Sequence, residues 1–177
     1  MILLFFIILD NPFDMAIRDF FQRNRTPFLD KTFTIITKSA DKEVFLVSEV
    51  ILSNFFSEHE REDAKLLLFG VGLSSLSVLT LKVLFKRKRP SGELKSAFDY
   101  AFPSGHATGS FSFAYILSKR HKNLKFLLYS WAFLVGISRI YLDRHWTTDV
   151  LAGIVIGTFW GYLVMKNERK ILDFKIK

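Results

Sequence analysis

Residues suited to chemistry, among them basic residues and two histidines, lie between residues 82 and 149. In chain order they are Lys82, Arg89-Pro90, Pro103-Ser104-Gly105-His106, Ser138-Arg139, His145 and Asp149. Three fixed cations, Lys82, Arg89 and Arg139, can surround the nonbridging oxygens of a phosphate group and stabilise the charge of its transition state. These residue types therefore predict a site for phosphoryl transfer.

The stretch FPSGHATGS, residues 102–110, predicts the start of a helix at Ser104 and Gly105. Backbone N–H groups at a helix start point towards a bound anion, and the helix dipole favours negative charge there. Glycine also lets the backbone approach such a ligand closely. We therefore predict that Ser104 and Gly105 bind phosphate together with the three cations.

The two histidines suit the two remaining tasks of phosphate ester hydrolysis, which are attack on phosphorus and protonation of the departing alkoxide. His145 and Asp149 are spaced i, i+4, so a helix starting near Trp146 can bring the carboxylate towards the imidazole and hold one tautomer. We predict that His145 is the nucleophile. His106 shows no carboxylate partner in the sequence and is predicted to be the proton donor, and then the base for the water that cleaves a phosphohistidine.

The composition of the chain indicates a membrane protein that forms one domain over residues 1–177. Half of its 177 residues are hydrophobic, 20 are Phe and none is Cys, and the mean hydropathy is +0.22. A soluble globular protein rarely needs so much Phe, and the length suits a single domain. We predict an all-α integral-membrane bundle of five or six transmembrane helices.

Three apolar runs predict membrane-spanning helices at residues 66–85, 124–142 and 147–165. Each is about the ~20 residues that a spanning helix needs. Residues 104–118 are shorter and more polar, and predict a span that neighbouring helices shield from lipid. On the last helix, Gly153, Gly157 and Gly161 recur every four residues, which predicts one row where another backbone approaches closely.

The first third of the chain predicts shorter helices. Residues 27–40 and 43–56 are apolar runs separated by the charges at 41–43, and predict two helices that pack together. Residues 10–25 predict an amphipathic helix in the membrane interface, with charge on its other face. Its apolar face would carry Phe13, Ile17, Phe20 and Phe21. Residues 1–9 are too short to span, and no small-residue cleavage site indicates a removable signal peptide.

Counting membrane crossings predicts that the polar residues meet on one side. The helix over 66–85 carries Lys82 there, the helix over 104–118 starts there, and the helix over 124–142 returns Arg139 to it. The basic residues at 119–125 and 166–177 lie on the opposite side, which the positive-inside rule places in the cytoplasm. The site would then face the periplasm from a bacterial inner membrane. The basic run 86–89 opposes the rule, and an anionic ligand would explain it.

The spacings K-x6-R-P from Lys82, P-S-G-H from Pro103 and S-R-x5-H-x3-D from Ser138 resemble the three signatures of the type 2 phosphatidic acid phosphatase family, which includes vanadium haloperoxidases. The resemblance implies a metal-independent phosphatase with a six-helix membrane bundle and no cofactor. It implies a phosphohistidine on His145, acid catalysis by His106, and Asp149 as the residue that orients the nucleophile. It also implies phosphate binding by Lys82, Arg89, Ser104, Gly105 and Arg139.

A site among membrane helices implies a lipid phosphate that arrives laterally from the bilayer. The additional cations Lys86, Arg87, Lys88 and Lys95 favour a headgroup with more than one negative charge. Compact bacterial proteins that this chain resembles act on lipid A, phosphatidylglycerophosphate or undecaprenyl diphosphate. We expect a lipid A 1-phosphatase-like enzyme, without a nucleic acid partner or an obligate protein partner.

Three alternatives use the same residues differently. A serine hydrolase would use Ser104 with a histidine and Asp149. An anion transporter or lipid-binding protein would need the cations but not the pair of His145 and Asp149. A vanadate-dependent oxidant is the alternative within the family. Outside the predicted site, His59 and His121 are expected to be structural. Asp143 and Arg144 lie in one loop, could pair with each other, and are given no catalytic role.

Overall fold

The computed structural model describes residues 11–41, 44–45, 57–92 and 99–174. Within these residues all regular structure is helical, as predicted. Among the described residues, three helices are long and apolar enough to cross a membrane: Glu58–Phe85, Lys122–Tyr141 and Thr147–Lys166. They confirm the three predicted spans at 66–85, 124–142 and 147–165, and the first begins earlier than predicted. Residues 1–9, and all of the predicted helix 43–56 except residues 44–45, lie outside the described residues.

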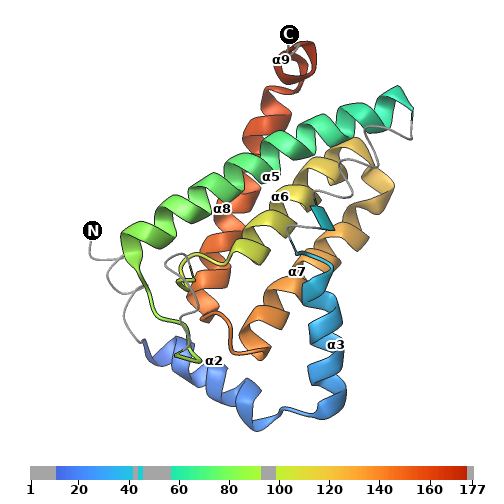
Figure 1. The fold of residues 1–177 in the computed structure, drawn as a ribbon. Coiled ribbons are helices and arrows are strands. Elements are labelled where there is room, and N and C mark those ends of the chain that lie inside the picture. The colour runs from blue at the N-terminus through green and yellow to red at the C-terminus, as the bar shows by residue number, and fades with distance from the viewer. Residues whose placement is uncertain (1–10, 42–43, 46–56, 93–98, 175–177) are drawn as a thin grey trace.

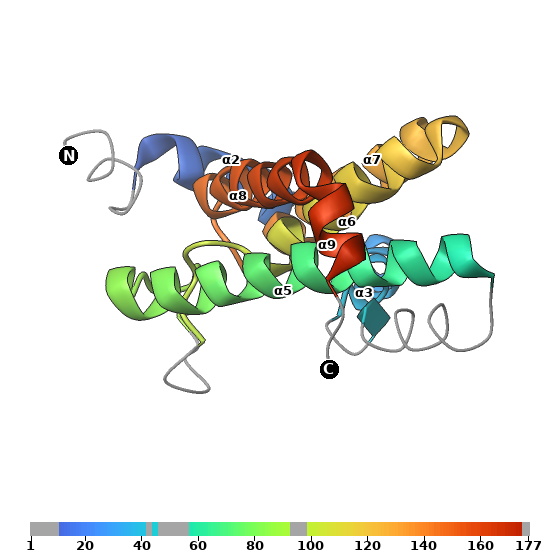
Figure 2. The same ribbon diagram turned by 90° about the horizontal axis from the view of Figure 1, so that it is seen from above.

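Helix α6 (Gly105–Arg120) lies at the centre of the bundle. It contacts α5 (Glu58–Phe85), α7 (Lys125–Tyr141) and α8 (Thr147–Lys166), and Figure 2 shows α5 on one side of it and α8 on the other. Its 16 residues make it shorter than the three candidate spans. The prediction that neighbouring helices shield this polar segment is confirmed, because every residue from Ala107 to Ser112 is buried.

The predicted glycine row brings α8 against α6. A Cβ atom on Gly153 would lie 2.7 Å from the carbonyl oxygen of Ser104, and one on Gly161 would lie 2.8 Å from Cβ of Tyr115. A Cβ atom on Gly157 would overlap the backbone of Thr108. These distances confirm close backbone approach as the role of the row, and they set how near the start of α8 lies to the start of α6.

In the part of the chain that the structure describes, two short helices precede the bundle: α2 (Pro12–Arg23) and α3 (Pro27–Lys38). Each has proline at its first position and a polar cap before it, with Asn11 accepting a hydrogen bond from Asp14 N and Thr26 accepting one from Leu29 N. Figure 1 shows both helices at the end of the bundle where α7 ends and α8 begins. A 3-10 turn at Lys122–Leu124 and a short helix, α9 (Glu168–Asp173), lie towards the other end of the bundle.

The orientation of α2 differs in part from the prediction for residues 10–25. Phe13 and Phe20 are exposed, as expected of side chains that face lipid. Ile17 and Phe21, however, pack against the cluster of Ala107, Ile140 and Val150. The charged side also faces the protein in part, since Asp14 is fully buried. The helix therefore uses polar contacts to attach to the bundle, which the amphipathic pattern alone does not indicate.

Lipid-facing and packed glycines should respond oppositely to an added methyl group. Gly157→Ala should destabilise the protein by about 1–3 kcal/mol, because overpacking forces α6 and α8 apart. Gly72→Ala is the matched control on α5, where a Cβ atom meets nothing within 4 Å, and it should be neutral or stabilising by up to ~1 kcal/mol through helix propensity. Thermal unfolding of both variants in detergent measures the difference. Equal melting temperatures would contradict the packing role of Gly157.

Candidate active site

Four helix ends place the predicted site residues at one end of the bundle. Lys82 lies in the last turn of α5 and Arg139 in the last turn of α7, while α6 begins at Gly105 and α8 at Thr147. The loop residue His145 precedes α8 directly, and the Ser104 backbone N–H donates to the Asp149 carbonyl over 3.0 Å. The structure thus brings together the three separate sequence stretches, as the crossing count predicts.

Two of the three predicted phosphate-binding cations are held by the backbone around them. Lys82 is buried and its Nζ donates to the carbonyl of Tyr100. Arg89 donates from Nε to the Asp99 carbonyl over 2.9 Å, from Nη2 to the Asp99 carboxylate over 2.6 Å, and from Nη1 to the Arg144 carbonyl over 3.1 Å. These contacts fix the guanidinium of Arg89 between the loops that follow α5 and α7.

Arg139 and Ser104 are buried with polar atoms that have no partner among the described residues. Arg139 donates from Nη1 to Thr37 Oγ1 over 2.7 Å, while its Nε and the Oγ of Ser104 are unpaired there. Such groups are costly to bury without a hydrogen bond. The backbone N–H of Ser104 differs from the prediction, because the carbonyl of Asp149 already accepts it. Gly105 is the first residue of α6, where N–H groups have no partner within the helix.

The ring of His145 is oriented by a backbone carbonyl. Its Nδ1 lies 2.7 Å from the Ala101 carbonyl oxygen, which can only accept, so Nδ1 carries the proton and Nε2 keeps its lone pair. The Asp149 carboxylate is 3.8 Å from Nδ1. Ala101, rather than the predicted Asp149, therefore makes the hydrogen bond that selects the tautomer.

The electrostatic surroundings keep the His145 ring neutral. Burial lowers its pKa well below the usual value, and the nearby cations lower it further. Those cations are Arg139, Arg89 and Lys82, in order of effect. A neutral imidazole with a free Nε2, surrounded by cations, can attack an electrophilic phosphorus atom.

Asp149 is fully buried and holds the turn before α8. Its Oδ2 accepts from the Trp146 backbone N–H over 2.8 Å, and its Oδ1 accepts from Arg87 Nη1 over 2.7 Å. Arg87 is itself buried, so it does not extend into solvent as the predicted headgroup cation. The carboxylate thus acts on the backbone next to His145 instead of on its ring.

His106 has a carboxylate partner that the sequence interpretation missed. Its Nε2 lies 2.9 Å from Asp41 Oδ1, and Asp41 follows α3 directly in the turn after Lys38. The only sequence signal was the break in hydrophobicity at residues 41–43. Asp41 and His106 lie 65 positions apart. Their contact therefore depends on how α3 docks against the bundle in the tertiary structure.

Two other sequence interpretations are corrected. Asp143 does not pair with Arg144 but with Arg18 of α2, at 2.6 and 2.9 Å. Ser104 is not activated as a serine nucleophile would be, because its Oγ contacts no histidine or carboxylate among the residues described. The serine hydrolase alternative therefore lacks the base that its chemistry needs.

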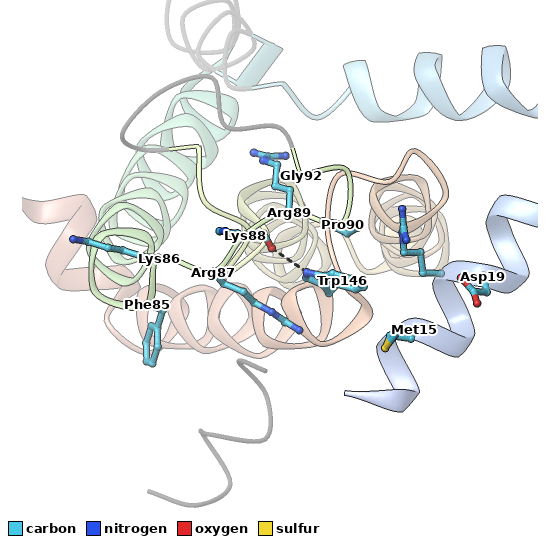
Figure 3. A pocket seen from close by; sticks show the side chains of 11 residues that line it. Met15, Asp19, Phe85, Lys86, Arg87, Lys88, Arg89, Pro90, Gly92 and Trp146 are labelled. Atoms are coloured by element: carbon cyan, nitrogen blue, oxygen red, sulfur yellow. Dashed lines mark hydrogen bonds between the residues drawn. The ribbon is translucent and has the colours of Figure 1, made fainter. Parts of the chain in front are cut away.

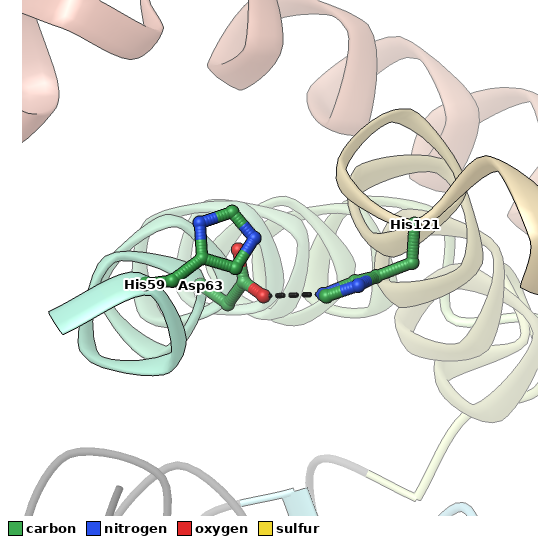
Figure 4. A group of neighbouring side chains, drawn as sticks. All are labelled: His59, Asp63 and His121. Atoms are coloured by element: carbon green, nitrogen blue, oxygen red, sulfur yellow. Dashed lines mark hydrogen bonds and ion pairs between the residues drawn. The ribbon is translucent and has the colours of Figure 1, made fainter. Parts of the chain in front are cut away.

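A second group of titratable residues lies at the opposite end of the bundle. His121 Nε2 is 2.6 Å from Asp63 Oδ2, and His59 approaches the same carboxylate (Figure 4). The guanidinium of Arg120 binds this group, at 2.6 Å from Asp63 Oδ1 and 2.8 Å from His59 Nδ1. A cation already neutralises the carboxylate, which fits the structural role expected for both histidines.

Candidate membrane-spanning helices with a buried cluster of cations beside a histidine at one end form the arrangement expected of a membrane-embedded phosphatase. The chain belongs to the PAP2 superfamily, whose family model matches residues 63–172. It is 32% identical over 166 residues to phosphatidylglycerophosphatase B of Bacillus subtilis (strain 168), covering 86% of this chain and 82% of that protein. It is 33% identical over 161 residues to a lipid A 4′-phosphatase of Porphyromonas gingivalis, covering 79% of this chain and 66% of that protein.

Solved structures share the same fold. Aquifex aeolicus LpxE superposes with a TM-score of 0.78 at 29% identity, covering 89% of this chain and 97% of that one. The transmembrane PAP2-type phosphatidylglycerolphosphate phosphatase of B. subtilis gives a TM-score of 0.76 at 31% identity, covering 92% of this chain and 87% of that one. The protein is thus an integral-membrane lipid phosphatase of this superfamily.

Removing the charge of Asp41 should impair catalysis rather than substrate binding. If His106 is the acid–base group predicted from the sequence, Asp41→Asn should lower kcat by roughly tenfold to a hundredfold with little change in KM, because the carboxylate would orient a group whose proton transfer contributes about 10²–10⁴. Phosphate release from a lipid phosphate in detergent micelles measures both constants. Asp30→Asn, a partly exposed acid on α3 paired with Arg25, is the control. An unchanged kcat in Asp41→Asn would show that His106 does not depend on this partner.

Proposed function

We propose that the protein hydrolyses a phosphate monoester or anhydride of a membrane lipid through a phosphohistidine on His145, within a single membrane-embedded domain. The observation that carries the proposal is the hydrogen bond from His145 Nδ1 to the Ala101 carbonyl, at 2.7 Å. This bond leaves Nε2 as the free nucleophilic atom. Lys82, Arg89 and Arg139 are then the cations that bind the phosphate oxygens, with the N–H groups at the start of α6.

The first step transfers the phosphoryl group to the enzyme. Nε2 of His145 attacks phosphorus, and the bond from phosphorus to the lipid oxygen breaks. His106 donates a proton to that oxygen as it leaves, so the lipid departs as an alcohol or as a shorter phosphate. Arg139 and Arg89 stabilise the charge that spreads over the three remaining oxygens.

The second step releases inorganic phosphate. His106, now deprotonated, accepts a proton from a water molecule whose oxygen attacks phosphorus. The bond from phosphorus to Nε2 breaks, and the neutral imidazole of His145 is restored. The contact of His106 with Asp41 supports this role, because a carboxylate stabilises the protonated ring that is formed in the second step.

The substrate that we favour is lipid A, with hydrolysis of its 1-phosphate. The similarity to a lipid A 4′-phosphatase supports lipid A as the substrate class, while the choice of the 1-phosphate rests on the resemblance of the sequence to compact bacterial lipid phosphatases. A pocket of about 500 Å³ between α2 and the loop after α5 also supports lipid A (Figure 3). Lys86 and Lys88 line this pocket with exposed side chains, and they can bind a second anionic group on the same headgroup.

A second substrate has support of its own. The chain covers most of phosphatidylglycerophosphatase B and most of the solved B. subtilis phosphatidylglycerolphosphate phosphatase at similar identity. Phosphatidylglycerophosphate also carries two phosphate groups, so the same pocket suits it. Undecaprenyl diphosphate is the third candidate, through a shorter match to undecaprenyl-diphosphatase BcrC.

We place the site on the periplasmic face of a bacterial inner membrane. The opposite end of the bundle carries the basic residues Lys119, Arg120 and Lys122 and the basic carboxyl-terminal segment, which the positive-inside rule assigns to the cytoplasm. The relatives named above are bacterial. Exposed Phe13 and Phe20 on α2 fit the headgroup region of the leaflet from which the substrate would enter.

Substrate and mechanism can be tested together. The detergent-purified protein, incubated with a chelator and lipid A, phosphatidylglycerophosphate or undecaprenyl diphosphate, should release inorganic phosphate fastest from lipid A. His145→Ala should abolish release, because no other group can form the covalent intermediate. His106→Ala should lower the rate of release strongly, because it removes both the proton donor of the first step and the base of the second. Release from none of the lipids, or full release by His145→Ala, would refute the proposal.

The basic pocket should contribute to the recognition of lipids with two phosphate groups. The double variant Lys86→Ala/Lys88→Ala should lower kcat/KM by roughly tenfold for lipid A bisphosphate, since two charge contacts are lost at about 0.5–1 kcal/mol each. The effect on phosphatidic acid, with one phosphate group, should be smaller. An equal loss for both lipids would assign the two lysines to general attraction of anionic lipids.

A further inference from the structure

Asp14 of α2 is a charged residue buried at the edge of the site. Its side chain is 0% exposed, and its ion-pair partner Arg87 is 4% exposed. A buried carboxylate is costly unless it is paired and fully hydrogen-bonded. Neither residue belongs to the signature positions of the site, so their burial requires a separate explanation.

Arg87 joins two buried carboxylates. Its Nη2 donates to Asp14 Oδ2 over 2.8 Å, and its Nη1 donates to Asp149 Oδ1 over 2.7 Å. Nη1 also lies 2.7 Å from Thr148 Oγ1, and the guanidinium lies 5.5 Å from the centre of the Trp146 ring. With its terminal nitrogens engaged in this way, Arg87 does not act as a phosphate ligand like Arg89 or Arg139.

Asp14 also binds the first turn of α8 directly. The backbone N–H of Thr148 donates to Asp14 Oδ1 over 2.9 Å, and the hydroxyl of Thr148 donates to Oδ2 over 2.6 Å. A carboxylate from another helix therefore serves as an N-terminal cap for α8, and its charge is favourable at that end of the helix dipole. This contact connects residues 134 positions apart.

The network continues to His145. Asp149 uses Oδ1 for Arg87 and Oδ2 for the backbone N–H of Trp146. Trp146 follows His145 directly, and its indole nitrogen donates to the carbonyl of Lys88 over 3.0 Å (Figure 3). The segment that contains Arg87 and the segment that contains His145 are thus fixed to each other at two points.

We propose that Arg87, held by Asp14, is a positioning residue that fixes the turn of His145 through Asp149, and that α2 is thereby required for the active geometry. The inference rests on the proposed role of His145 as nucleophile. It explains why a helix in the membrane interface presents a carboxylate to the protein. It also gives Asp149 a function, which is to hold the turn of His145, although its carboxylate makes no hydrogen bond to the His145 ring.

Conservative variants separate positioning from binding. Arg87→Lys keeps the charge but cannot bridge two carboxylates, and Asp14→Asn keeps the size but not the charge. We expect each to lower kcat by roughly tenfold or more, because a displaced nucleophile loses near-attack geometry. KM and the Kd for orthovanadate, a phosphate analogue, should stay within about twofold, because Lys82, Arg89 and Arg139 are unchanged.

Arg25 and Asp30 provide the matched control. They form a partly exposed pair at 3.0 Å between the segment that follows α2 and the first turn of α3, and Arg25→Lys and Asp30→Asn should leave kcat unchanged. Titration with orthovanadate counts the folded sites in each preparation, so kcat is expressed per binding site. In the double variant Asp14→Asn/Arg87→Lys, kcat should fall by less than the product of the two single fold-decreases, because both residues act through one network.

The outcomes distinguish this inference from the proposed function. If the unaltered protein releases no phosphate from any lipid, the proposed function fails. If it is active and both single variants keep kcat per site, the positioning role of Arg87 is wrong while the function stands. If both variants bind no orthovanadate, Arg87 and Asp14 support folding in general, which also overturns the inference.

Discussion

The site depends on compensating the free-energy cost of burying charged side chains at the point where four helix ends meet. Lys82, Arg87, Arg139 and Asp149 are each less than one-tenth exposed, and buried ions are tolerated only when partners compensate the lost hydration. Asp149 is compensated twice, by Arg87 and by the Trp146 N–H. Near His145, Arg89 pairs with the Asp99 carboxylate over 2.6 Å. Lys82 donates to the Tyr100 carbonyl and Arg139 to the Thr37 hydroxyl, so neutral acceptors hold these two cations.

The need to compensate buried charge also explains why backbone carbonyl groups contact the site residues. Carbonyl groups of Tyr100, Ala101 and Asp99 accept from Lys82, His145 and Arg89 respectively. One extended segment before α6 therefore orients three functional side chains at once. Since a carbonyl oxygen is a neutral acceptor, it positions Lys82 without cancelling the lysine's charge, whereas Arg89 is also paired with the Asp99 carboxylate.

Packing in the membrane brings these segments close enough to interact. The row of glycines on α8 lets its backbone approach α6, and this approach places Ser104 within hydrogen-bond distance of Asp149. On the outer surface, large apolar side chains such as Phe126, Val155 and Leu84 are exposed, as lipid-facing positions require. The polar site is thus built at helix ends, where loops can satisfy charged groups that the lipid region cannot.

The sequence by itself determined the class of the protein. Apolar runs of spanning length indicated the helices, and the crossing count placed Lys82, Arg139, His145 and Asp149 on one side, since each span reverses the direction of the chain. Only the tertiary structure decided which groups touch. Asp41 contacts His106, Asp14 contacts Arg87, and Asp143 pairs with Arg18. These contacts join residues more than 60 positions apart, and local periodicity carries no information about how short helices such as α2 and α3 dock against the bundle.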